Sequence, residues 1–116
     1  MEKVYNKLVR DNIPDIIKNN NEVPFTKVLG DDEYKMELDK KLLEECNEVL
    51  SSSGDDRLHE LADVIEVVSA LAKIEGKNLN NVITIANEKS NKRGAFDKKI
   101  FLEKVISKDS ENTWKY

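Results

Sequence analysis

Two apolar stripes joined by a short polar turn constrain the fold of this chain more than any other feature. Residues 32–50 and residues 57–75 each place apolar side chains on one side of a helix drawn at about 100° per residue. The segment between them, residues 51–56, reads Ser-Ser-Ser-Gly-Asp-Asp and is typical of a turn. Because the connection is short, the sequence predicts an antiparallel helical hairpin.

Each stripe also carries a pair of carboxylates. Glu45 falls inside the first stripe and Glu48 lies at its edge, while Glu60 and Asp63 lie at the N-terminal end of the second. An unpaired buried carboxylate is costly, and four together repel one another. Hard cations such as Mg²⁺ take oxygen ligands, so the hairpin predicts an acidic site for a divalent cation. The alternative is that each pair belongs to a solvated helix face.

The remaining pattern predicts a mainly α fold with at most a short two-stranded β patch. We expect a short helix after Asn12, a strand over residues 23–29 and a third long helix over residues 79–93. Residues 98–106 fit either a strand or a helical turn. The expected architecture is therefore a helical hairpin or four-helix type of fold.

Length and charge narrow the class of protein. The 116 residues fit one domain over residues 1–106 and a polar tail, residues 107–116, in which Trp114 and Tyr116 can dock. A net charge of −4 disfavours binding to duplex nucleic acid, which needs a basic face. The apolar runs are too short to span a bilayer, so we expect no membrane association. The single Cys46 and the lack of an apolar signal segment favour the cytoplasm.

Basic residues gather near the end of the third long helix. Lys89 and Arg93 stand four positions apart, and Asn87 lies on the same helix. Like charges at this spacing repel unless an anion lies between them, which predicts a phosphate-binding face. The alternative is that the basic residues only match the helix dipole.

These segments resemble a known family. KLLEECNEVL, residues 41–50, and ELADVIEVV, residues 60–68, match the pattern K-x-x-E-E-x-x-E followed by E-x-x-D. That pattern marks the all-α nucleoside triphosphate pyrophosphohydrolases, the MazG-like and phosphoribosyl-ATP pyrophosphohydrolase superfamily. ANEKSNKRGAF, residues 86–96, resembles the family's downstream segment. The opening YNKLVRDNIP, residues 5–14, resembles a small house-cleaning branch.

The resemblance implies Mg²⁺-dependent cleavage of the α–β phosphoanhydride of a noncanonical nucleoside triphosphate, with Mn²⁺ as a substitute ion. The products would be the monophosphate and pyrophosphate. The acidic residues that would hold the metal are Glu45, Glu48, Glu60 and Asp63. Glu44 becomes the candidate that orients or deprotonates the attacking water.

The resemblance also assigns substrate contacts to Lys89, Arg93 and Asn87, and more weakly to Lys7 and Arg10. The alternative for the last two is a salt-bridged N-terminal arm that involves Asp11. Ser90 stands where the family often has an aromatic residue, so base and sugar specificity stay open. We expect His59 to be a partly exposed structural residue and Cys46 to be a small buried hydrophobe.

Apolar residues surround the second long helix almost completely, which predicts a homo-oligomer built on it. The resemblance likewise implies a homodimer or a dimer-based tetramer with active sites near the subunit interface. Two rival functions remain: phosphoribosyl-ATP hydrolysis in histidine synthesis, and a non-catalytic helical interaction protein on the same fold.

Overall fold

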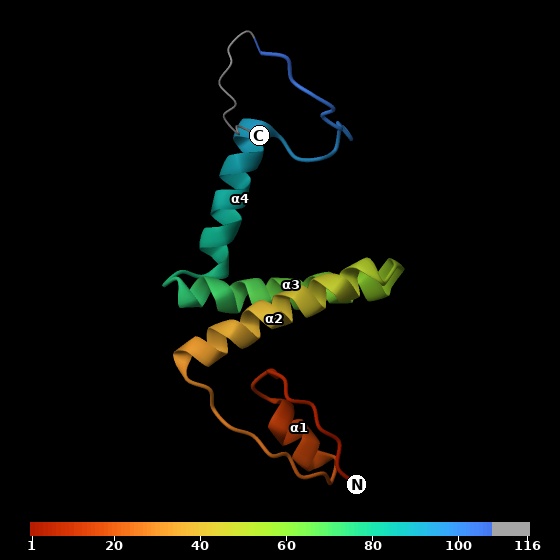
Figure 1. Ribbon diagram of the computed structural model, residues 1–116, viewed down its shortest axis with the longest axis vertical. Helices are drawn as coiled ribbons and strands as arrows, with labels where there is room; N and C mark the ends of the chain where they lie inside the picture. The colour runs from red at the N-terminus through yellow and green to blue at the C-terminus, as the bar shows by residue number, and fades with distance from the viewer. Residues whose placement is uncertain (108–116) are drawn as a thin grey trace.

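The structure is a computed structural model that describes residues 1–107, and it is mainly α-helical there (Figure 1). No strand forms within this part of the chain. The prediction of a mainly α fold is therefore confirmed. The helices, in chain order, are α1 (Ile13–Asn19), α2 (Asp31–Leu50), α3 (Gly54–Ile74) and α4 (Leu79–Arg93).

Helices α2 and α3 form the predicted antiparallel hairpin and lie side by side along most of their length (Figure 1). Residues 51–53 connect them. Helix α4 leaves the far end of α3 and stands away from the hairpin (Figure 1). The hydrophobic side chains that are buried in the described part all belong to the hairpin: Leu38, Val49, Val67 and Ala72.

Local sequence signals explain where the helices begin and end. Three acidic residues occupy the first turn of α2, where negative charge stabilises the helix dipole. Asn78 and Asn81 form a capping box at the start of α4, each side chain accepting a hydrogen bond of 3.0 Å from the other's backbone N–H. Gly76, with φ of +72°, lets the chain turn directly after α3.

One expected helix boundary and one expected capping interaction differ in the structure. Helix α3 begins at Gly54 rather than near Arg57, so the turn between the long helices is shorter than predicted. Asn12 occupies the N-cap position of α1, but its side chain makes no capping hydrogen bond. The bounds of α4 agree with the predicted residues 79–93.

The predicted strand over residues 23–29 is wrong, because no described segment pairs with its backbone. This stretch is extended chain in which Val23, Phe25 and Val28 are exposed. Residues 98–106 form neither a strand nor a helix. A tight turn overlaps the start of this segment, and in it the backbone N–H of Lys99 donates to the carbonyl of Phe96 at 3.2 Å. The expected docking of Trp114 and Tyr116 lies outside the described residues.

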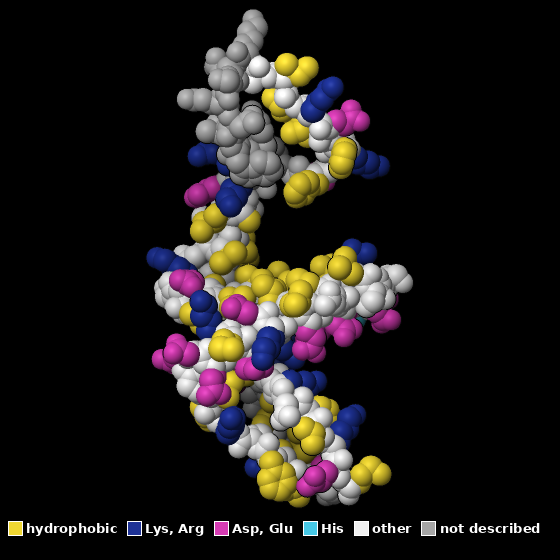
Figure 2. All heavy atoms as spheres, in the orientation of Figure 1, with side chains coloured by type: hydrophobic (Ala, Val, Ile, Leu, Met, Phe, Trp, Pro, Cys, Tyr) yellow, Lys and Arg dark blue, Asp and Glu magenta, His cyan; other side chains and the backbone are white. Residues whose placement is uncertain are grey.

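The isolated chain is extended and exposes much apolar surface. Its radius of gyration is 19.8 Å, whereas a compact chain of this length has about 13 Å. Its accessible surface is 11205 Å², against about 6,500 Å² for a compact monomer of 13.3 kDa. Figure 2 shows hydrophobic side chains along the upper side of the hairpin, below α4. Among the described helices, none combines the length and the hydropathy needed to cross a membrane.

The hairpin core gives a direct test of the packing. Leu38→Ala should lower the free energy of unfolding by about 2–5 kcal/mol, because it removes a side chain that is 3% exposed and leaves a cavity. Asp39→Ala, at the exposed next position of α2, should change it by no more than about 0.5 kcal/mol. Denaturant unfolding measures the free energy of unfolding of both variants. Equal decreases in the two variants would show that the face of α2 that carries Leu38 is not buried.

Candidate metal centre

Three carboxylates from the two hairpin helices converge on one point. Glu45 comes from α2, and Glu60 and Asp63 come from successive turns of α3. One carboxylate oxygen of each lies within 4.8 Å of the others, and all three residues are half-buried. The antiparallel packing positions them, because the end of α2 lies against the start of α3. Each of the three residues offers one oxygen atom to a shared cation.

The two other predicted acidic residues lie at the border of this triad. Glu48, one turn beyond Glu45, is exposed and is not among the three converging carboxylates. Its charge nevertheless acts on Glu60. Glu44 is exposed and lies outside the triad as well, so its role toward water stays a prediction.

The electrostatics of the triad are those of crowded negative charges. Partial desolvation is the largest cause that raises the pKa of the Glu60 carboxyl group above its ordinary value. Repulsion by neighbouring carboxylates adds to it, in the order Asp63, Glu48 and Glu45. A carboxyl group in this setting holds its proton more firmly until a cation offsets the neighbouring charges.

Two basic side chains offset part of this charge. Lys41 lies one turn before Glu45 on α2, and its Nζ is 3.7 Å from Glu45 Oε1. Arg10, from the segment before α1, donates from Nη2 to Asp63 Oδ1 at 2.7 Å. The expected alternative for Arg10 was an arm that involves Asp11, whereas the structure pairs Arg10 with a carboxylate of the triad.

Sequence reasoning missed both contacts. The Lys41–Glu45 pair has an ordinary i,i+4 helix spacing, which is a signal that the sequence contains. The Arg10–Asp63 pair joins residues 53 positions apart and has no such local signal.

Of the predicted substrate contacts, Arg10 reaches the triad of its own chain, whereas those on α4 do not. Asn87, Lys89 and Arg93 are exposed on α4, which projects from the opposite end of the hairpin (Figure 1). Lys7 is also exposed, and its Nζ lies 5.5 Å from the centre of the Tyr5 ring. The structure therefore gathers three of the predicted acidic residues and Arg10, and it leaves the basic residues of α4 apart from them.

His59 and Cys46 are the two remaining residues that the sequence singles out, and neither belongs to the triad. His59 is exposed, and its expected structural role stays a prediction. Cys46 is a free thiol and is half-buried, so it is less enclosed than expected.

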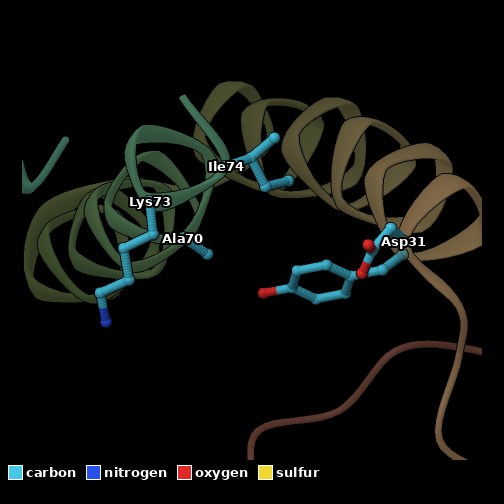
Figure 3. A pocket seen from close by; sticks show the side chains of 5 residues that line it. Asp31, Ala70, Lys73 and Ile74 are labelled. Carbon is cyan, nitrogen blue, oxygen red and sulfur yellow. The ribbon is translucent and has the colours of Figure 1, made fainter. Parts of the chain in front are cut away.

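A cleft lies at the other end of the hairpin from the triad. It measures about 450 Å³, and Figure 3 shows it between the first turn of α2, at Asp31, and the last turns of α3, at Ala70, Lys73 and Ile74. Tyr34 also lines it. The cleft is open and carries no convergent carboxylates, so the triad is the better candidate for a functional site.

The donor set of the triad fits a hard divalent cation. Three carboxylates offer only oxygen atoms, which Mg²⁺ and Mn²⁺ accept, and their partly exposed position leaves room for water to complete the coordination. Glu48 lies close enough to Glu60 for its negative charge to add to the attraction of the site for a cation.

Comparisons with known proteins add little to this geometry. No protein-family model matches the chain. No solved structure matches it. A curated protein of Mycolicibacterium smegmatis, described only as an uncharacterized protein, is 42% identical over 50 residues. The match covers 43% of this chain and 51% of that protein, so the chain spans about half the length of the relative that it matches.

The raised pKa of Glu60 gives a prediction about pH. The folded protein binds this proton more tightly than the unfolded chain, so Glu60 stabilises the fold at acidic pH, and this contribution is lost as the pH rises through its raised pKa. Glu60→Gln does not titrate. In chelator, the variant should therefore gain stability relative to the parent as the pH rises from the ordinary carboxyl pKa of 4.5 through the raised pKa of Glu60.

Thermal unfolding across this pH range measures the gain. Glu66→Gln, at an exposed position of the same helix, is the control and should show no such pH dependence relative to the parent. If both variants follow the same pH profile, the crowding of negative charge around Glu60 is absent in solution.

Proposed function

We propose that this chain is a Mg²⁺-dependent nucleotide pyrophosphohydrolase that cleaves the α–β phosphoanhydride of a noncanonical nucleoside triphosphate. The observation that carries the proposal is the convergence of Glu45, Glu60 and Asp63 from two packed helices. These residues occupy the acidic positions of the family pattern that the sequence resembles. Repulsion among carboxylates destabilises a fold, so a role in packing alone would not explain why these three residues converge.

The proposed site divides the work among a few residues. Glu45, Glu60 and Asp63 hold the ion, and Glu48 adds its charge from the edge. A bound Mg²⁺ supplies polarisation of the phosphoryl oxygens and neutralises the charge of the leaving pyrophosphate. Glu44 orients the attacking water. Lys89, Arg93 and Asn87 contact the substrate phosphates, as do Lys7 and Arg10.

The same proposal includes assembly into a homodimer or a dimer-based tetramer. The chain exposes about 4,700 Å² more than a compact monomer of its mass, which is more surface than one partner contributes to most obligate interfaces. Leu58, Leu61 and Ile65 form an exposed apolar row on α3. The basic residues of α4 do not reach the triad of their own chain, so a second copy supplies them.

The catalytic proposal predicts different effects for an acidic and a basic variant. Glu60→Gln should abolish measurable Mg²⁺ binding and lower pyrophosphate release by at least about 100-fold, because an ion ligand is lost. Lys89→Ala should raise KM about tenfold with Mg²⁺ affinity unchanged, because it loses only a phosphate contact. A panel of noncanonical nucleoside triphosphates, incubated with Mg²⁺ and scored for pyrophosphate, identifies the substrate for both assays.

Glu66→Gln serves as the matched control and should keep the activity of the parent. Should the parent bind Mg²⁺ but release pyrophosphate from no nucleotide in the panel, a non-catalytic helical interaction protein becomes the better explanation. Phosphoribosyl-ATP belongs in the panel, since its selective hydrolysis would favour the rival enzyme.

The assembly proposal is tested by sedimentation. At about 10 μM the chain should sediment as a dimer or tetramer, because contiguous exposed hydrophobic side chains such as those on α3 favour association in water. Ile65→Lys should weaken the assembly, whereas Glu66→Lys, at the adjacent position, should not. A stable, folded monomer of 13.3 kDa would contradict the proposal.

A further inference from the structure

The segment before α1 meets the hairpin at an ion pair. We call residues 1–12 the N-terminal arm. Its Arg10 donates from Nη2 to Oδ1 of Asp63 at 2.7 Å. Leu8 and Val9, directly before Arg10, are half-buried, whereas residues 1–7 are exposed. The arm is therefore seated at this end of its length, next to the acidic triad.

The partner of Arg10 is one of the converging carboxylates. A guanidinium on Asp63 places a positive charge beside Glu45 and Glu60, where it offsets part of their repulsion. It also engages lone pairs of a carboxylate that the proposed metal centre requires, and its charge repels an arriving divalent cation. The guanidinium of Arg10 therefore neutralises part of the negative charge that a bound ion would otherwise neutralise.

The Arg10–Asp63 ion pair is exposed enough for a cation to replace Arg10 at Asp63. The side chain of Arg10 is 57% exposed and that of Asp63 is 40% exposed, and exposed ion pairs are weak. The Lys41–Glu45 pair differs, because both of its residues belong to α2 and its loss would move no other segment. Loss of the Arg10–Asp63 pair would instead free the arm.

We propose that Arg10 competes with the divalent cation for Asp63, so that the arm is held on the hairpin in the metal-free protein and is loosened when the ion binds. This inference rests on the proposed metal centre. Because coupling between two binding events is reciprocal, whatever weakens the seating of the arm strengthens the binding of the ion.

The test is a calorimetric titration of the full chain with Mg²⁺ alone. Arg10→Gln should bind Mg²⁺ about fivefold more tightly than the parent, because the competitor is gone. In chelator, the same variant should melt a few degrees lower, because the triad has lost its counter-charge. Lys3→Gln removes the same charge from the exposed part of the arm and should change neither value.

The outcomes separate the two proposals. If the parent takes up no Mg²⁺, the metal centre itself is wrong. If the parent binds Mg²⁺ and Arg10→Gln binds it equally, Arg10 does not compete. If Arg10→Gln binds it more weakly, Arg10 positions Asp63 as a ligand, which also overturns the competition.

A second measurement needs no variant. Trypsin should cleave the parent after Lys7 faster in Mg²⁺ than in chelator, relative to its cleavage of the α2–α3 hairpin, because the ion releases the arm. An unchanged ratio would overturn the inference even if Arg10→Gln failed to fold.

Discussion

Repulsion among carboxylates is the constraint on which the rest of this structure depends. The packing of α2 on α3 buries Leu38 and Val67, and the same packing brings Glu45 close to Glu60 and Asp63. The hydrophobic contact and the electrostatic cost are therefore inseparable in this hairpin. Lys41 and Arg10 offset part of that cost, one from the same helix and one from a distant segment.

The helices could be predicted from the sequence because their signals are local. Apolar periodicity located the hairpin, and the bounds of α4 followed from its pattern and from Gly94. The strand over residues 23–29 was predicted wrongly from the alternation of its side chains. Alternation is a property of a single segment, whereas a β-strand also needs a partner strand to pair with. The earlier start of α3 depends on Gly54, its first residue, which adopts φ of +58° directly after the short turn.

The acidic half of the candidate site could be predicted for the same reason. Helical geometry alone places Glu45, Glu60 and Asp63 on facing stripes, and the structure brings them together. Glu48 stayed outside the triad because it lies at the edge of its stripe. The contact of Arg10 with Asp63 depends on the path of the chain between α1 and α2, which no periodicity describes.

The short connection over residues 51–53 limits where residues can be deleted from this chain. With so few residues between α2 and α3, a deletion there must consume the last turn of one helix or the first turn of the other. Each lost helical residue rotates the following side chains by about 100° and would turn a carboxylate away from its neighbours. Insertions and deletions between α1 and α2, where the chain is exposed, would leave the triad in register and would change only the path that brings Arg10 to Asp63.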